Sequence, residues 1–269
     1  MDYEQEAKEY LIKRLSAEIS FQNNLETIIE DYAYKLTDIA YAANVPPNLF
    51  TFEYNDTIKK NVDAIISEIR QLIVTITETL AVSTHTDDKD SILDYISRDI
   101  SGNNFYERLD GHIDTLKREL EGVIAASLLI GASKSDSKAG LKKYLRYPYQ
   151  NPIFQEASKL NTGKAEVLKS KGLHLGIGIS NSAFNSINML GRYTISDAWM
   201  NWYYDKYDGI GAIGYNVKRG SSYPCSLCDS NVGFHTDGNL PPYHPSCCCI
   251  AIPVFENNMG GGEKEIQEF

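Results

Sequence analysis

The sequence predicts a mainly α protein, in which a helical N-terminal bundle is followed by a small α+β C-terminal lobe. Through roughly the first 145 residues, apolar side chains recur at steps of three and four residues, which is the period of an amphipathic helix. From Tyr147 the pattern changes to a turn-rich segment, 147–152, and later to two short apolar segments that flank the cysteine-rich part of the chain. Short runs of this kind between turns are typical of strands.

Four helices are expected in the N-terminal part. The apolar stripes place them at 10–36, at 58–80, from Asp90 or Ser91 onward, and at 105–129. Pro46 and Pro47 separate the first two helices, because proline cannot continue a helix. The stripes indicate the core of a bundle, since no polar residue recurs within them that would suggest a cofactor site.

The C-terminal part is expected to mix short helices with strands. The elements expected there are a helix near 154–160, an extended piece at 173–179, a helix at 182–204, and strands at 214–219 and 250–254. We therefore expect a helical domain at 1–146, a C-terminal domain at 147–257 and a flexible tail at 258–269, whose glycines favour mobility.

The composition is globular but acidic. With 42% hydrophobic residues in 269, the chain has ample material for a core, and its formal net charge is −10. An acidic surface is poorly suited to phosphate contacts, so we expect weak or no direct nucleic-acid binding. The most apolar stretch, 123–132, is about half of a membrane-spanning helix, and the charged start is no secretory signal. We expect no membrane partner and synthesis in the cytosol.

All five cysteines lie between Cys225 and Cys249, which indicates one local device rather than a disulfide framework. Cys225 and Cys228 have the spacing of a metal knuckle, and His244 and Cys247 repeat that spacing with an imidazole in front. Two such pairs can close a tetrahedron of thiolate and imidazole ligands around zinc. The sequence therefore predicts a structural zinc site in a zinc-knuckle lobe, with Cys225, Cys228, His244 and Cys247 as ligands.

The choice of ligands leaves alternatives open, because only four groups can bind zinc at once. Cys249 lies two residues beyond Cys247, on the same side of an extended strand, and is the alternative fourth ligand. Cys248 would point away from that side. His235 could take the place of His244, although the glycines around it suggest the tip of a loop.

The rival interpretations of the cluster are a redox pair, a catalytic thiol, free buried cysteines or a catalytic zinc. A thioredoxin-like motif belongs at a helix start after a strand, and a catalytic zinc needs an open coordination position and a general base. No His-x-Glu partner of a deaminase precedes Cys225, and the acidic charge argues against a nuclease. The glycines of 209–214 match a dinucleotide fingerprint, but a helix precedes them and an extended segment follows, the reverse of the required order. We expect no enzyme.

The residues of the cluster resemble a known family. Cys225-x-x-Cys228, followed by Leu-Pro-Pro-Tyr-His244-Pro-x-Cys247-x-Cys249 and an apolar strand, is similar to the C-terminal signature of the phage Mu F-like head morphogenesis proteins. These are minor capsid proteins. The chain departs from the signature at Cys248, where the family has arginine. A helix with Arg192 and Trp199 shortly before the first strand also fits the resemblance.

The resemblance implies a minor phage head protein that acts in head morphogenesis or DNA ejection by binding portal or capsid proteins. It implies a place in the virion, in the phage head, and in the host cytoplasm during assembly. Some relatives carry fused toxin or protease domains, for which the 15 residues after Val254 leave no room. The alternative is a zinc-stabilised protein that contacts or processes nucleic acid.

Overall fold

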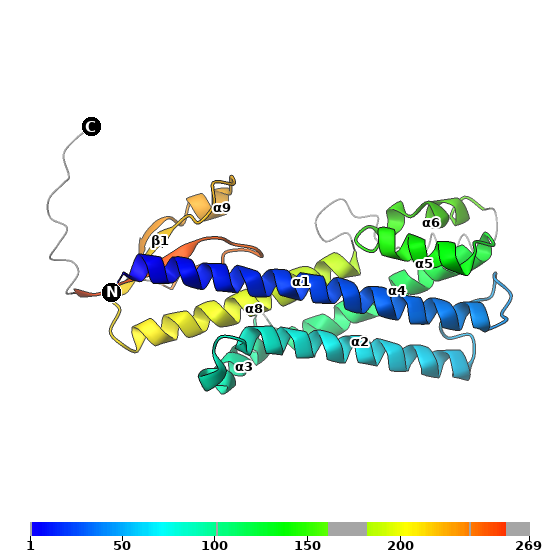
Figure 1. Ribbon diagram of the computed structural model, residues 1–269, viewed down its shortest axis with the longest axis horizontal. Helices are drawn as coiled ribbons and strands as arrows, with labels where there is room; N and C mark the ends of the chain where they lie inside the picture. Colours follow the sequence, from blue (N-terminus) through cyan, green and yellow to red (C-terminus); the bar gives the residue numbers. More distant parts are fainter. Residues whose placement is uncertain (1, 101, 161–181, 237, 257–269) are drawn as a thin grey trace. The chain divides into compact units, whose positions relative to one another are not determined.

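The computed structural model describes residues 2–100, 102–160, 182–236 and 238–256. It confirms the expected fold class, because the described residues are mainly helical and carry a small three-stranded antiparallel sheet near the C-terminus (Figure 1). The helices are α1 (Tyr3–Ala42), α2 (Asp56–Val82), α3 (Lys89–Ser97), α4 (Phe105–Leu129), α5 (Lys134–Lys143), α6 (Pro152–Ala157), α8 (Ala183–Asp208) and α9 (Ser226–Asp229), with 3-10 turns at Thr86–Asp88 and Pro148–Gln150. The strands are β1 (Gly214–Lys218), β2 (Gly233–His235) and β3 (Ile250–Val254).

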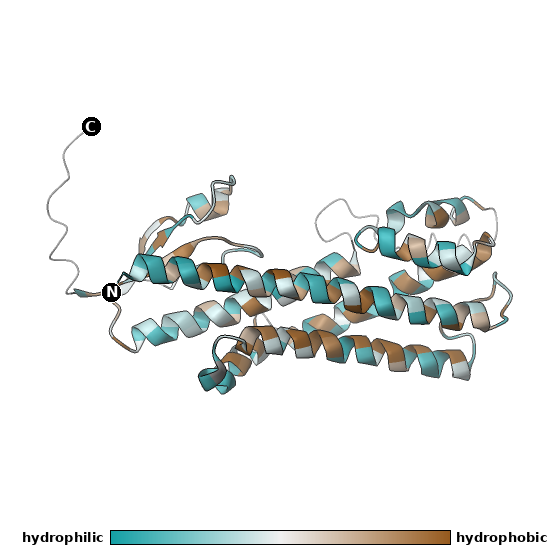
Figure 2. Ribbon diagram, in the orientation of Figure 1, coloured by the Kyte–Doolittle hydropathy of each residue, from teal (hydrophilic) through white to brown (hydrophobic). Residues whose placement is uncertain are grey.

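Local sequence signals account for most of these bounds. The long helix α4 has the bounds that its apolar stripe predicts, because Asn104 caps it: the Asn104 side chain accepts from the Glu107 N–H at 3.1 Å, and the Glu107 carboxylate accepts from the Asn104 N–H at 3.0 Å. The apolar residues that recur along α2 are visible in Figure 2. Among the described residues, no helix is long and apolar enough to cross a membrane.

Some expectations differ from the structure or fall outside it. Neither Asp90 nor Ser91 is the N-cap of α3, which begins at Lys89 after Asp88, because the 3-10 turn at Thr86–Asp88 leads directly into the helix. The turn-rich segment 147–152 also contains a 3-10 turn, which ends at Gln150, and the extended Asn151 is the N-cap of α6. The extended piece expected at 173–179 and the tail at 258–269 lie outside the described residues.

The contacts divide the chain into two compact units, each made of several chain segments, whereas the sequence suggested a single boundary near residue 147. Unit 1 comprises the described residues of Met1–Phe21, of Thr77–Arg98 and from Gly191 onward, and unit 2 comprises those of Gln22–Ile76 and Asp99–Leu190. The N-terminal segment therefore groups with the sheet, because α1 supplies side chains to the same core cluster as the strands.

In unit 2 a buried carboxylate holds the start of α8. Both oxygens of Glu119, on α4, accept from the backbone N–H of Ala183, at 3.1 and 3.0 Å, and Tyr149 donates its hydroxyl to the same carboxylate at 2.8 Å. A carboxylate at a helix N-terminus satisfies N–H groups that the helix leaves free and opposes its dipole. Burial nevertheless raises the pKa of Glu119, because it penalises the charged form.

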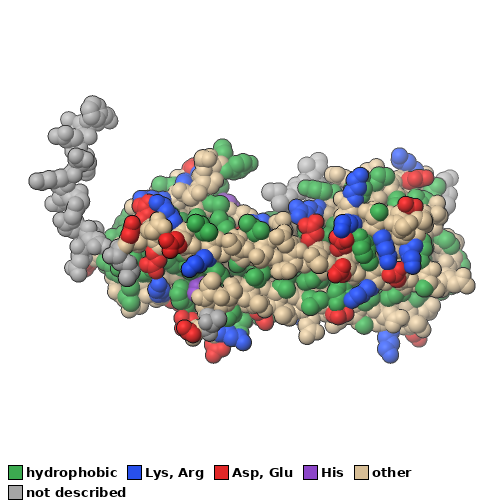
Figure 3. Space-filling model, viewed as in Figure 1, with side chains coloured by type: hydrophobic (Ala, Val, Ile, Leu, Met, Phe, Trp, Pro, Cys, Tyr) green, Lys and Arg blue, Asp and Glu red, His purple; other side chains and the backbone are tan. Residues whose placement is uncertain are grey.

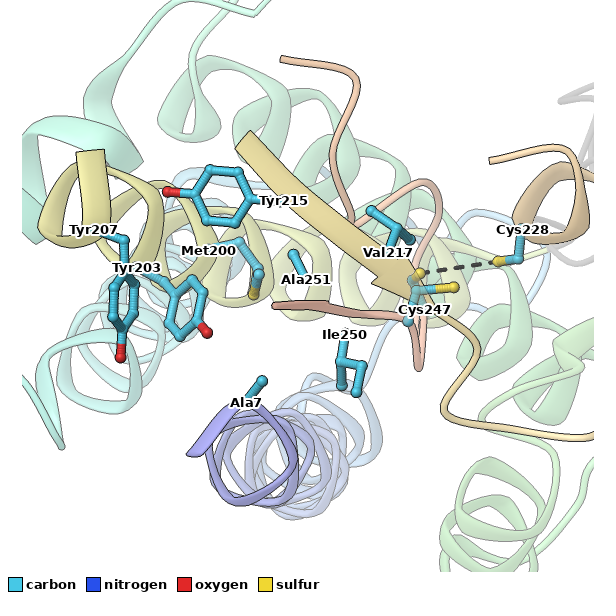
Figure 4. Packing of buried hydrophobic residues seen from close by; sticks show 11 residues of the cluster. Ala7, Met200, Tyr203, Tyr207, Tyr215, Val217, Cys228, Cys247, Ile250 and Ala251 are labelled. Atoms are coloured by element: carbon cyan, nitrogen blue, oxygen red, sulfur yellow. Dashed lines mark hydrogen bonds between the residues drawn. The ribbon is translucent and has the colours of Figure 1, made fainter. Parts of the chain in front are cut away.

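In unit 1 the sheet has the order β2-β1-β3, with both neighbours antiparallel to β1. In Figure 4, Ile250 of β3 points toward Ala7 in the first turns of α1. Ala251 and its register partner Val217 of β1 lie on the opposite face of the strands, because successive strand residues point to opposite sides. The buried core cluster draws on α1, α8, the sheet and the cysteine segment; its members are Ala7, Met200, Tyr203, Tyr207, Tyr215, Val217, Cys228, Cys247, Cys249, Ile250 and Ala251.

A second packing centre of unit 1 surrounds His85, which lies between α2 and the 3-10 turn at Thr86–Asp88. Its ring is buried against Trp199 and Trp202, at centroid distances of 4.8 and 4.1 Å. Tyr10 donates its hydroxyl to the carbonyl of Trp199 at 2.6 Å, and the Tyr10 hydroxyl oxygen lies 3.0 Å from His85 Nε2. Burial lowers the pKa of His85, since the charged ring would lose its hydration.

This geometry predicts that acid destabilises unit 1 through His85. The unfolded chain takes up the proton near the ordinary pKa of about 6.5, whereas the folded chain resists it until a lower pH, so stability falls as the pH drops below about 6.5. The His85→Gln variant keeps a donor for Tyr10 but does not titrate. As the pH is lowered from 7.5 to 5.5, we expect the wild type to lose unfolding free energy relative to the variant, by at most about 1.4 kcal/mol per pH unit. Urea titration at each pH measures the two unfolding free energies. Parallel pH profiles would contradict this expectation.

Candidate metal centre

Three short pieces of unit 1 bring the cysteines together. Cys228 lies in the single turn of α9, where the Asp229 N–H donates to the Cys225 carbonyl at 2.8 Å. Cys247 and Cys249 precede β3, which is fixed to β1 by a register that pairs Lys218 with Ile250. The loop after β1 runs so close to this segment that a Cβ atom on Gly220 would overlap the Cys248 carbonyl, which requires a residue without a side chain there.

The ligand atoms form two overlapping triads that share Cys228. In each triad the atoms lie within 4.8 Å of one another: Cys225, Cys228 and His244 make up the first, and Cys228, Cys247 and Cys249 the second. His244 Nε2 is 3.3 Å from Cys225 Sγ and 3.1 Å from Cys228 Sγ. Cys228 Sγ is 3.9 Å from Cys247 Sγ, and a dashed line joins these two residues in Figure 4. Ligands of a tetrahedral zinc ion are separated by about 3.5 to 3.8 Å, so the donor set fits a metal ion of this kind.

His244 has the orientation that metal binding requires. Its Nδ1–H donates to the carbonyl of Pro245 at 2.8 Å, which leaves the Nε2 lone pair directed at the two thiols. Burial lowers the pKa of His244, but the Pro245 carbonyl and the neighbouring thiolates outweigh burial, and the pKa is raised overall. A metal ion would replace the extra proton on Nε2.

Within the second triad, one thiol ionises readily and two resist ionisation. The hydrogen bond from Cys249 lowers the pKa of Cys247 to about 5 against the effect of burial, and the positive charge of Arg14 acts in the same direction. Burial raises the pKa of Cys228 to about 12. The hydrogen bond that Cys249 gives to Cys247 raises the pKa of Cys249. A bound cation would displace these retained protons, so metal affinity falls as the pH is lowered.

The predicted ligands Cys225, Cys228, His244 and Cys247 all lie in the two triads, together with the alternative ligand Cys249. Cys248 belongs to neither triad, and its thiol instead donates to the Ser246 carbonyl at 3.5 Å. The alternative ligand His235 does not lie at a loop tip, because its backbone pairs with Tyr215 in the sheet, and its Nε2 lies 3.0 Å from the Asn231 carbonyl.

A buried charge network lies beside the cluster and was not predicted from the sequence. Arg14 of α1 is fully buried and donates from Nη2 to the Cys247 carbonyl at 2.6 Å and from Nη1 to Ser196 Oγ of α8. Glu18, also fully buried, accepts from Arg192 at 3.2 Å. The signal was present, because Arg14 and Glu18 stand three and four residues from apolar neighbours on the buried stripe of α1, where a charge is exceptional.

A surface cavity of about 190 Å³ borders the first triad. Arg219 lines it, but its guanidinium is already held by the Asp229 carboxylate and the Tyr223 carbonyl. No carboxylate is among the residues described as lining the cavity, which are Arg219, Ser221, Tyr223, Cys225, Cys228, His244, Ser246, Cys248 and Cys249. A metal-bound water there would lack a carboxylate base in the cavity wall.

Compared with models of known protein families, with curated proteins and with solved structures, the chain matches none of them. The site is therefore interpreted from its own residues: a cluster of Cys and His side chains in unit 1, three of whose thiols belong to the core, that can hold a metal ion.

We expect protein purified without chelators to carry about one zinc ion per chain. Metal removal is expected to unfold residues 214–254, here called the cysteine lobe, since structural zinc contributes on the order of 10 kcal/mol to folding. Cys228→Ser is expected to abolish binding, because Cys228 belongs to both triads. Elemental analysis and limited proteolysis after residue 214 report the two effects.

Cys248→Ser is the matched control, since it removes a thiol from the same segment but from neither triad. It is expected to bind zinc as the wild type does. Full zinc content in Cys228→Ser, or metal-free wild-type protein, would show that the cluster is no zinc site. Comparison of Cys247→Ser with Cys249→Ser identifies the fourth ligand.

Proposed function

We propose that this protein is a minor head protein of a tailed phage or prophage, whose C-terminal lobe is held by a structural zinc ion. The observation that carries the proposal is the convergence of the signature residues: Cys225, Cys228 and His244 form one triad, and Cys247 and Cys249 complete the other. The residues that give the resemblance to the phage Mu F-like family are thus those that meet in space.

A structural role for the metal is supported by where the ligands lie. Cys228, Cys247 and Cys249 are members of the core cluster of unit 1, each at most 3% exposed. The double-proline segment of the signature is attached as well, because Tyr204 of α8 donates its hydroxyl to the Pro241 carbonyl at 2.5 Å. Ligands embedded in a core brace the fold, whereas a catalytic zinc keeps one position open to substrate.

Binding to portal or capsid proteins is supported by apolar side chains on the cysteine lobe. Four large hydrophobic residues in the segment 223–234 are about half exposed or more: Tyr223, Leu227, Val232 and Phe234. Exposed apolar residues gathered on a small lobe favour a protein partner. Acidic and basic side chains are interspersed on the face seen in Figure 3, which gives less support to nucleic acid as the partner.

The proposal predicts that the tagged protein, expressed during phage growth, co-purifies with portal protein or procapsids at a copy number well below that of the major capsid protein. The double variant Leu227→Ser, Val232→Ser is expected to weaken this association at least several-fold while retaining zinc, because both side chains are exposed. Leu49→Ser is the control, since Leu49 is equally exposed in unit 2.

DNA binding is expected to be weak and to vanish at moderate salt, because the chain is acidic. Nuclease assays in the presence of zinc are expected to show no cleavage. Tight, salt-resistant DNA binding, or cleavage that is lost on replacing His235 or His244, would favour a nucleic-acid-processing protein instead.

A further inference from the structure

A buried guanidinium group lies beside the thiols. Arg14, which stays protonated in proteins, donates to the Cys247 carbonyl, and Glu18 accompanies it on the same helix. Arg14 and Glu18 are both 0% exposed, so water does not screen this charge. A buried charge is costly unless an opposite charge lies nearby.

The basic residues at the end of β1 are engaged elsewhere, because each has its own acidic partner. Lys218 pairs with Glu4 at 2.6 Å, and Arg219 pairs with Asp229. A divalent ion bound by three thiolates and one neutral imidazole carries one negative charge. Such a centre in the thiol cluster would be stabilised by the positive charge of Arg14 beside it.

Arg14 connects the network to the cluster. Its Nη2 donates to the carbonyl of Cys247, a residue of the second triad, at 2.6 Å, and its Nη1 donates to Ser196 on α8. The planar guanidinium fixes both acceptors at once, which a lysine ammonium at the end of a flexible stem does less well. The first turns of α1 also pack on the core cluster, through Ala7, Tyr10 and Leu11.

We propose that Arg14 is a positioning residue of the metal centre: its guanidinium holds the Cys247 backbone in place and supplies the positive charge that the thiolate-rich centre requires. Metal occupancy and the packing of the N-terminal part of α1 within unit 1 are thereby coupled. This inference rests on the proposed zinc site. It assigns to α1 a part in metal binding although none of the ligands lies on that helix.

The test measures zinc affinity of the full chain by competition with a chromophoric chelator. Arg14→Met removes the charge and the hydrogen bonds but keeps much of the apolar stem, and is expected to lower zinc affinity 10- to 100-fold, the usual effect of losing a group that orients a ligand. Arg14→Lys keeps the charge but not the two fixed hydrogen bonds, and is expected to recover only part of the affinity. The absorption of bound Co²⁺ reports whether the ligand set is unchanged.

Glu18→Gln separates this role from a merely structural one. It removes a negative charge from the same buried network and the carboxylate that Arg192 contacts, so it is expected to lower the stability of the metal-free protein, as Arg14→Met does. If Arg14 acts through charge, however, the zinc affinity of Glu18→Gln is unchanged or higher. Opposite effects on affinity with parallel losses of stability are the expected result.

If Arg14→Met does not fold, hydrogen exchange of the wild type tests whether metal occupancy is coupled to the packing of α1. Chelation is expected to lower the protection of α1 amides in the segment 3–21 more than that of α4 amides. Any of three results would overturn the role of Arg14 but leave the metal site intact. They are equal losses of zinc affinity in Arg14→Met and Glu18→Gln, an unchanged zinc affinity in Arg14→Met, and an unchanged protection of the α1 amides after metal removal. A wild-type chain that binds no zinc would overturn the metal site and this inference together.

Discussion

Unit 1 depends on the burial of a thiol cluster inside a hydrophobic core. Its three strands have only three to five residues each, and a sheet of that size buries too little apolar surface to stand alone. The missing stability comes from two sources: the packing of α1 and α8 on the strands, and the convergence of Cys and His side chains at their ends. Because Cys228, Cys247 and Cys249 are core members as well as candidate ligands, anything that changes their chemistry changes the packing.

The same cluster joins parts of the chain that are far apart in the sequence. Arg14 meets the Cys247 carbonyl, and Ala7 shares a core with Ile250 and Ala251. Such contacts close very long loops, which is entropically costly and slows folding. Unit 1 therefore cannot be completed until the last strand is available, and a metal cross-link at that point would secure contacts that are the slowest to form.

The electrostatics of the cluster follow from how little water reaches it. Burial raises the pKa of Cys228, whereas the hydrogen bond from Cys249 lowers that of Cys247, so neighbouring thiols of the same triad differ in their readiness to ionise. A guanidinium group placed against the Cys247 carbonyl favours the thiolate form nearby. The apolar side chains of the segment 223–234 lie outside this core and remain available to a partner.

Sequence and tertiary structure contributed different parts of this picture. Local signals determined the long helices, because their apolar period and caps act over a few residues: α4 has its predicted bounds, and so does β3. The candidate ligands were also readable, since Cys225 with Cys228 and His244 with Cys247 have spacings that only a local metal device explains. Three features could not be read in this way: the burial of His85, the grouping of the first turns of α1 with the sheet, and the contact of Arg14 with Cys247. Each arises from partners tens to hundreds of positions away, and a helical period shows which face of a helix is buried but not against what.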